Sequence, residues 1–190
     1  MPLLDSIEWD ALDIDEVKSN RSPELTLKAY FFEDSDSQKL GEVVNPHDHR
    51  YNFFTQCYSG RIENRWYRRP DSCDAPVEHF NAFHYFTPLN GGAGFTEFLE
   101  NVSLENYRSE VYGAGAGYTM KAEQLHTIRV AASQTVIVLA QFEDTVPPNQ
   151  PTTTFVRGKP PNLAGLYSRF TSDEIVKRLS LLRKLHLNLK

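Results

Sequence analysis

GEVVNPHDHRYNFFTQCYSG, residues 41–60, contains the pattern on which the prediction of fold and site rests. It places His47 and His49 two positions apart in a segment rich in Phe, Tyr and Val, a composition that favours a β-strand. Successive side chains of a strand point to opposite faces, so two imidazoles at this spacing share a face and can converge on one metal ion. An open metal site needs a third ligand from elsewhere in the chain, and His126 is the candidate.

The residues around the pair strengthen this interpretation. Six histidines in 190 residues produce an H-x-H pair by chance in roughly one such chain in six, so the bare pair is weak evidence. Three further residues, however, flank the pair: Gly41 six residues before the first histidine, Pro46 directly before it, and Gly60 eleven residues after the second.

This layout resembles the first motif of the cupin superfamily, G-x5-H-x-H-x3,4-E-x6-G. Four positions match it: Gly41, His47, His49 and Gly60. The glutamate position of the motif holds Phe53, or Phe54 in the longer spacing.

The second cupin motif, G-x5-P-x-G-x2-H-x3-N, is matched in part. Gly115 and His126 have the required separation. The positions for Pro, Gly and Asn hold other residues: Lys121, Glu123 and Val130. The resemblance covers roughly residues 25–142, with a strong first half and a weak second half.

The resemblance implies both a fold and a metal site. Cupins are conical barrels that hold a metal between the two motifs, so the expected fold is all-β, a cupin-like double-stranded β-helix or jelly-roll barrel. The implied metal ligands are His47, His49 and His126. Loss of the glutamate with all three histidines kept is similar to the three-histidine iron dioxygenases of this superfamily, such as the thiol dioxygenases and the diketone-cleaving enzymes.

The implied activity is therefore an Fe(II)-dependent dioxygenase that acts on a small organic substrate. Three neutral imidazoles leave the charge of a divalent iron uncompensated and leave positions open for an anionic or chelating substrate and dioxygen. Zinc, manganese or nickel are alternatives, since ligand identity alone distinguishes these metals poorly. Two other functions stay open: a non-redox cupin metalloenzyme, either an isomerase or a lyase, and a non-catalytic cupin that binds a small molecule and has structural histidines.

Composition bounds the class of protein. A chain of 190 residues, 40% apolar and 24% charged, is expected to form one globular domain. Its net charge of −5 argues against nucleic acid as a partner. The acidic start has no signal-peptide pattern, no apolar run is long enough to span a membrane, and two cysteines give no disulfide framework. We therefore expect a cytoplasmic protein.

The patterning divides the chain into an N-terminal extension (1–23), a cupin-like barrel (24–157), and a Pro-rich connection with a C-terminal helix (158–190). Strand patterns occur at 24–32, 39–45, 77–89, 118–120, 124–130, 135–141 and 153–156, and residues 95–112 have the pattern of a hairpin.

Ser59-Gly60 has the composition of a two-residue hairpin loop, which would pair the strand before it with the strand after it. If His47 and His49 face inward, alternation and this pairing bring five further residues to the same face. These candidate pocket residues are Tyr51, Phe53, Thr55, Asn64 and Trp66.

The C-terminal helix is predicted over about 172–187, with Thr171 and Glu174 in capping-box spacing. Its apolar face, Ile175, Leu179 and Leu182, is expected to dock on the barrel or on a second copy of the chain in a homodimer. His186 lies near its basic end, where a solvated cation is expected. His79 and His84 stand among aromatic residues, which favours packed side chains over metal ligands.

Overall fold

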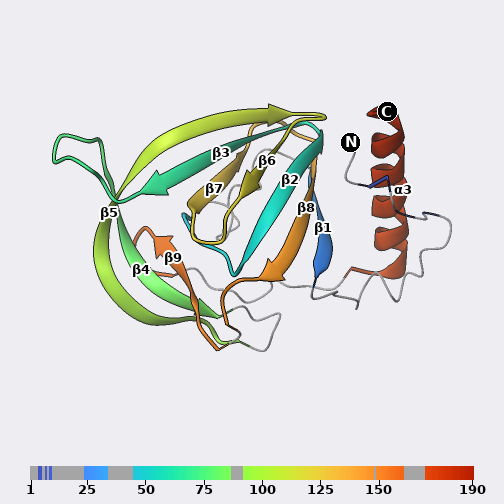
Figure 1. The fold of residues 1–190 in the computed structure, drawn as a ribbon. Coiled ribbons are helices and arrows are strands. Elements are labelled where there is room, and N and C mark those ends of the chain that lie inside the picture. Colours follow the sequence, from blue (N-terminus) through green and yellow to red (C-terminus); the bar gives the residue numbers. More distant parts are fainter. Residues whose placement is uncertain are drawn as a thin grey trace.

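The computed structural model describes residues 4, 5, 7, 9, 24–33, 45–86, 92–147, 149–160 and 170–190. Within these ranges the elements are β1 (Leu25–Phe32), β2 (Tyr51–Ser59), β3 (Arg61–Arg68), β4 (Glu78–Phe86), β5 (Gly94–Gly113), β6 (Gly117–Met120), β7 (Leu125–Val130), β8 (Thr135–Asp144), β9 (Thr152–Val156) and α3 (Ser172–Asn188) (Figure 1). The described chain is mostly β with a C-terminal helix, as the sequence predicts. The strands expected at 24–32, 77–89, 118–120, 124–130, 135–141 and 153–156 appear as β1, β4, β6, β7, β8 and β9.

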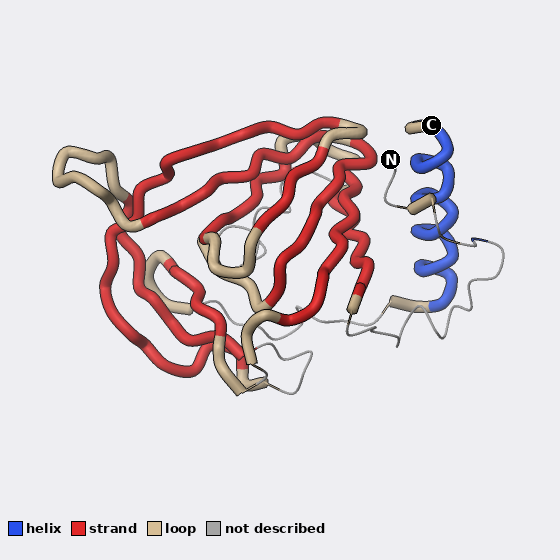
Figure 2. Tube along the Cα trace, in the orientation of Figure 1, coloured by secondary structure: helices blue, strands red, loops and turns tan. Residues whose placement is uncertain are grey.

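The strands form two antiparallel sheets. Sheet A has the strand order β1-β8-β2-β6, and sheet B has the order β7-β3-β5-β4-β9. Figure 2 shows that sheet B curls strongly along its length. The long strand β5 pairs with β4 through its first half and with β3 through its second half, and register shifts interrupt both pairings. Such bulges bend a strand and increase its twist, which accounts for the curl.

The predicted hairpin over residues 95–112 is wrong, because this segment lies within the single strand β5 of 20 residues. Residues 96–101 are all exposed, and their polar members resemble a turn in the sequence. The two halves of β5 pair with two different strands, β4 and β3. The polar stretch therefore continues as a strand and does not turn back on itself.

The predicted hairpin at Ser59-Gly60 is also wrong. Strand β2 pairs with β6 and β8 in sheet A, whereas β3 pairs with β5 and β7 in sheet B. The two residues therefore form a corner at which the chain crosses from one sheet to the other. Gly60 has φ of 69°, and an added Cβ would lie 2.6 Å from the Thr135 Cα, so only glycine fits this corner.

The alternation within each strand does not depend on the hairpin, because it follows from the two-residue period of the strand. The sequence places Asn64 and Trp66 on the inner face through the hairpin pairing, and both are buried although β2 and β3 do not pair. Four side chains expected inside on β2 and β3 are at most 3% exposed: Phe53, Thr55, Asn64 and Trp66. Tyr51, at the start of β2, is half-buried.

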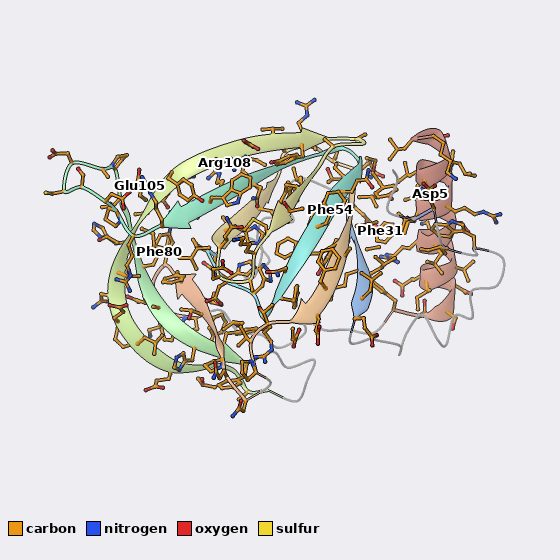
Figure 3. All side chains as sticks on the ribbon, viewed as in Figure 1. Asp5, Phe31, Phe54, Phe80, Glu105 and Arg108 are labelled. Atoms are coloured by element: carbon orange, nitrogen blue, oxygen red, sulfur yellow. The ribbon has the colours of Figure 1, made fainter. Side chains whose placement is uncertain are left out.

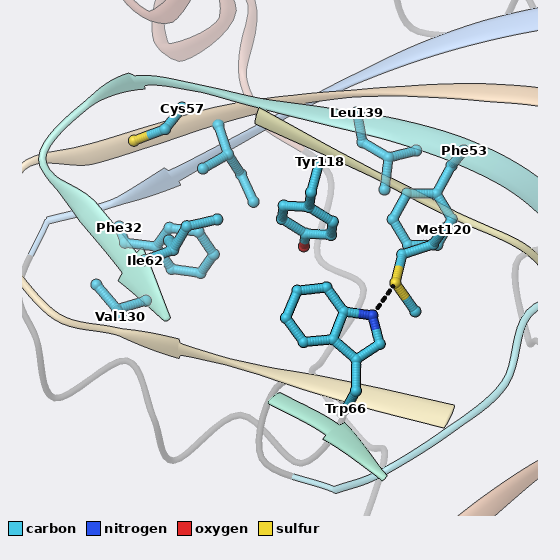
Figure 4. Packing of buried hydrophobic residues seen from close by; sticks show 10 residues of the cluster. Phe32, Phe53, Cys57, Ile62, Trp66, Tyr118, Met120, Val130 and Leu139 are labelled. Atoms are coloured by element: carbon cyan, nitrogen blue, oxygen red, sulfur yellow. Dashed lines mark hydrogen bonds between the residues drawn. The ribbon is translucent and has the colours of Figure 1, made fainter. Parts of the chain in front are cut away.

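Three clusters of buried apolar side chains stabilise this arrangement. The first joins the inner faces of both sheets and consists of Phe32, Phe53, Cys57, Ile62, Trp66, Tyr118, Met120, Val130, Ile137 and Leu139 (Figure 4). The second fills the curl of sheet B with Tyr67, Phe80, Ala82, Val102, Leu104 and Phe155. The third lies between sheet A and α3 and consists of Leu4, Tyr58, Val136, Val138 and Leu182. Sheet A is thus covered on both faces, which explains why residues 135–140 of β8 are all buried.

Helix α3 begins at the predicted capping box. The Thr171 side chain accepts a hydrogen bond from the Glu174 backbone N–H, and the Glu174 carboxylate accepts one from the Thr171 N–H. Of the predicted apolar face, Leu182 is buried against sheet A, whereas Ile175 and Leu179 are half-buried. Figure 3 shows Phe31 on the side of sheet A that faces α3, with Asp5 close to the helix.

His186 is not the solvated cation that the sequence suggests. Its side chain is 2% exposed, and its ring centroid lies 6.1 Å from that of Trp9 and 6.3 Å from that of Tyr58. The prediction is wrong because residues near the N-terminus pack against the end of the helix. Burial, together with the Lys190 ammonium, lowers the pKa of His186, and the Asp5 carboxylate 3.4 Å away opposes this effect.

Cys57 is buried and Cys73 is exposed, and both are free thiols. Within the ranges that the structure describes, no helix has the length and apolar character needed to cross a membrane.

We predict that Leu182→Ala lowers the free energy of unfolding by about 2–5 kcal/mol, since a buried leucine is truncated where neighbours cannot fully collapse. The matched control is Leu187→Ala on the same helix, because Leu187 is 59% exposed and its loss should cost below about 0.5 kcal/mol. Urea denaturation measures both values. Equal effects of the two substitutions would contradict the docking of α3.

We predict that His186 makes stability pH-dependent. Its folded-state pKa lies below the ordinary value of 6.5, so below that pH the unfolded chain takes up a proton that the folded chain resists. Stability is therefore fully present above about pH 6.5 and falls as the pH is lowered. Between pH 8 and pH 5.5 the wild type should lose more unfolding free energy than His186→Phe, in which the other histidines still contribute. An identical loss in both proteins would disprove the assignment.

Candidate metal centre

The backbone of residues 46–48 joins the two edge strands of sheet B. On one side His47 and His126 of β7 exchange backbone hydrogen bonds, with N···O distances of 3.0 and 3.1 Å. On the other side the Phe155 N–H of β9 donates to the Pro46 carbonyl at 2.8 Å, and the Asp48 N–H donates to the Thr153 carbonyl at 3.2 Å. The segment therefore lies between β7 and β9 and completes a ring of strands.

The predicted strand around the histidine pair is replaced by this shorter arrangement. His47 forms isolated bridges with His126 and Thr154, and β2 begins only at Tyr51. Of the strand expected at residues 39–45, only Asn45 lies within the described residues. Because His47 pairs through its backbone with β7, the chain is still extended at this residue. The His47 and His49 side chains therefore reach the same site, as their two-residue spacing predicts.

The structure brings His47, His49 and His126 together. Their ligand nitrogens lie within 4.8 Å of one another, and the ring centroids are 4.7–5.1 Å apart. His47 and His49 are half-buried and His126 is buried. Backbone bonds hold each residue in place, since the His49 N–H also donates to the Ala122 carbonyl at 2.9 Å, in the connection between β6 and β7.

The outer ring nitrogens are held by hydrogen bonds that point the Nε2 atoms inward. His126 Nδ1 lies 2.6 Å from the Asn64 side-chain oxygen, and His47 Nδ1 lies 2.8 Å from the Asn45 carbonyl oxygen. Both partners are acceptors, so each Nδ1 carries the proton and each Nε2 carries a lone pair. Proteins orient metal-binding histidines by hydrogen bonds of this kind at the ring nitrogen that does not bind the metal.

The surroundings of His49 and His126 disfavour the charged form of the imidazole. Burial lowers the pKa of His126 well below its ordinary value, and the neighbouring His47 lowers it further. Burial likewise lowers the pKa of His49, with smaller contributions from His47, His126 and the Lys28 ammonium. Only the neutral imidazole can bind a metal, so these environments favour the ligand form.

One pair of these nitrogens has the spacing of two ligands of a divalent ion. His49 Nε2 and His126 Nε2 are 2.9 Å apart. Two nitrogens at about 2.0–2.1 Å from one ion and at right angles to each other are separated by about 2.9 Å. Asp48 lies between His47 and His49 in the sequence but is not part of this group. Its side-chain oxygen instead accepts a hydrogen bond from the Thr153 N–H at 2.6 Å. Among the residues that the structure describes, the donor set is therefore three imidazoles without a carboxylate.

Aromatic rings surround the histidines. The Phe53 centroid lies 4.7 Å from that of His49 and 5.5 Å from that of His126, and Phe53 is 1% exposed. Tyr51 lies 5.4 Å from His49, and Tyr118 of β6 lies 6.5 Å from His126. The position at which the cupin motif has a glutamate is thus filled by an apolar ring that shields the site from water.

The sequence also predicts Thr55, Asn64 and Trp66 as pocket residues. Asn64 orients His126, as described above, and is fully buried. Trp66 packs on Tyr118, with centroids 5.9 Å apart, and donates its indole N–H to the Met120 sulfur at 2.9 Å. Thr55 is 1% exposed, one inward position beyond Phe53 on β2. These residues support the site and do not all line it.

His79 and His84 lie outside the group of three. His79 Nδ1 is 3.0 Å from the Ser103 hydroxyl, and His84 Nδ1 is 3.2 Å from the Glu97 carboxylate. Both residues therefore have local partners on β5. His84 is half-buried, whereas His79 is exposed and is not the packed side chain that its aromatic neighbours in the sequence suggest.

Sequence reasoning missed the contribution of β1. Leu25 and Leu27 alternate with polar residues, the period of a half-buried strand, and the apolar side of such a strand ordinarily faces the interior between two sheets. The register gives the opposite result, because Lys28 is opposite Leu139, a member of the cluster between the sheets. Leu27 and Phe31 instead pack with the cluster under α3. Only knowledge that a helix covers the outer face could have revealed this inversion.

Comparisons with known proteins add no family. A scan of protein-family models finds no match to the chain, and a search of curated proteins finds none either. The geometry of the site therefore carries the functional argument.

We predict that replacement of any ligand sharply lowers metal content. Alanine variants of His47, His49 and His126 should lose bound metal because the remaining two imidazoles cannot complete the site. Alanine variants of His79, His84 and His186 are the matched controls and should retain it. Metal per chain is measured by elemental analysis after loading and desalting. Loss in a control variant with retention in His126→Ala would refute the assignment.

Proposed function

We propose that this chain is a metal-dependent dioxygenase that uses Fe(II), held by His47, His49 and His126, to act on a small organic substrate. The observation that carries the proposal is the donor set: three neutral imidazoles converge, and an apolar ring, Phe53, stands in place of a carboxylate. The proposal includes a cupin-like double-stranded β-helix, for which the curled sheet and its closure by residues 46–48 give support.

The chemistry needs no further cofactor. When bound, Fe(II) supplies the redox chemistry that allows dioxygen to react with an organic molecule. Both atoms of one dioxygen enter the product, and the substrate supplies the electrons, so no separate reductant is consumed. The protein binds and orients the substrate, and its aromatic residues exclude bulk water.

A non-redox metalloenzyme is the second candidate, and one observation favours it. The Tyr51 hydroxyl accepts a hydrogen bond from Lys28 Nζ at 3.1 Å, and the Tyr51 ring lies next to His49. A phenol at this position can transfer a proton to or from a substrate, as an isomerase or lyase requires. Zinc, manganese or nickel would serve such a reaction.

We predict that the Fe(II)-loaded protein consumes dioxygen with one or more members of a panel of small thiols and 1,3-diketones. Labelled dioxygen should place both oxygen atoms in the product, and His49→Ala should reduce consumption to background. Oxygen uptake and product mass measure the two outcomes. Turnover without oxygen by the zinc, manganese or nickel form would instead favour the isomerase or lyase, and absence of bound metal would favour a binding protein.

A further inference from the structure

The inner face of sheet A carries a cation beside the three histidines. Lys28 on β1 is opposite Leu139 on β8, and Leu139 is opposite Thr55 on β2. Opposed residues in antiparallel strands share a face, so Lys28 lies on the same face as buried Thr55. That face also carries Phe53, which contacts two of the histidines.

The Lys28 side chain extends from β1 across β8 toward β2. Its ammonium donates a hydrogen bond to the Tyr51 hydroxyl at 3.1 Å and lies 4.9 Å from the centre of the Tyr51 ring. Tyr51 in turn packs against His49, with ring centroids 5.4 Å apart. A half-buried ammonium is therefore held within reach of any molecule that occupies the histidine site.

A second polar group faces the same space. Gln141 is opposite Phe53 on one side and Thr26 on the other, which places its side chain on the inner face. Its Oε1 atom is buried and, among the described residues, has no hydrogen-bond partner. This buried carbonyl oxygen can accept a hydrogen bond from a ligand in the inner space between β1 and β2.

We propose that Lys28, Tyr51 and Gln141 form a subsite for the carboxylate end of the substrate, so that the substrate is a small organic acid. The Lys28 ammonium pairs with the carboxylate, the Tyr51 hydroxyl donates to it, and Gln141 accepts from an adjacent N–H or O–H of the ligand. The rest of the ligand reaches the three histidines. This inference rests on the proposed metal site and adds the class of substrate to it.

The charge arrangement explains why an anion is favoured over a neutral or cationic ligand. A divalent ion held by the three histidines, together with the Lys28 ammonium, creates a positive region beside the aromatic rings of Tyr51 and Phe53. Because Phe53 stands where the cupin motif has a glutamate, no carboxylate at that position offsets the positive charges of the ion and of Lys28. A charge-assisted hydrogen bond in such surroundings is stronger than one in water.

The test uses two thiols of equal size, 3-mercaptopropionate and 3-mercaptopropanamide, which differ only in the charge of one end. Each is titrated into Co(II)-loaded protein, in which thiolate coordination gives a charge-transfer absorption, and into metal-free protein by calorimetry. The variants are Lys28→Met, Lys28→Arg, and Lys121→Met as an exposed-lysine control. Thermal unfolding verifies that each variant is folded.

The wild type should bind the carboxylate about ten- to a hundredfold more tightly than the amide. Lys28→Met should abolish this preference and leave amide binding within about twofold, whereas Lys28→Arg and Lys121→Met should retain the preference. Equal binding of both thiols by the wild type, or an unchanged preference in Lys28→Met, overturns the subsite while leaving the metal centre intact. If Co(II) does not bind, the proposed function fails, and the calorimetric preference in metal-free protein then decides the subsite alone.

Discussion

The rest of this structure depends on the backbone pairing of residues 46–48 with β7 and β9. The same hydrogen bonds that close the curled sheet also place His47 directly against His126, since these two residues exchange both backbone bonds. The backbone hydrogen bonds that close the sheet are therefore the same ones that bring the ligands of the site together. A site built on paired backbone is held more accurately than one on a free loop, as a metal centre with fixed ligand positions requires.

This constraint works together with burial of the ligands. Taking His49 and His126 out of water disfavours their charged forms, and the Asn64 side chain and the Asn45 carbonyl select the tautomers that point Nε2 inward. The buried asparagine is itself satisfied by His126 and by the Met120 sulfur. A buried polar network of this kind is stabilising only when all its members are paired, which links the identity of Asn64 to that of His126.

Much of the site could be predicted from the sequence, because side-chain spacing along an extended chain is a local property. The two-residue spacing of His47 and His49 and the inward position of Phe53 needed no knowledge of strand partners. Strand pairing is different, since it depends on contacts far apart in the chain. Ser59-Gly60 satisfies the local requirements of a hairpin and of a corner equally well, and β5 resembles two strands because two partners share it. The inward position of Lys28 was hidden for the same reason, as α3 takes the apolar face of β1.

The most direct test of the account is the X-ray absorption spectrum of the Fe(II)-loaded protein at the iron edge, recorded for the wild type and for His126→Ala. If the three histidines bind the iron, the wild type shows outer-shell scattering from three imidazole rings and the variant shows it from two, at whatever iron content the variant retains. A wild-type spectrum explained by oxygen ligands alone, or one that is unchanged by loss of His126, would contradict it.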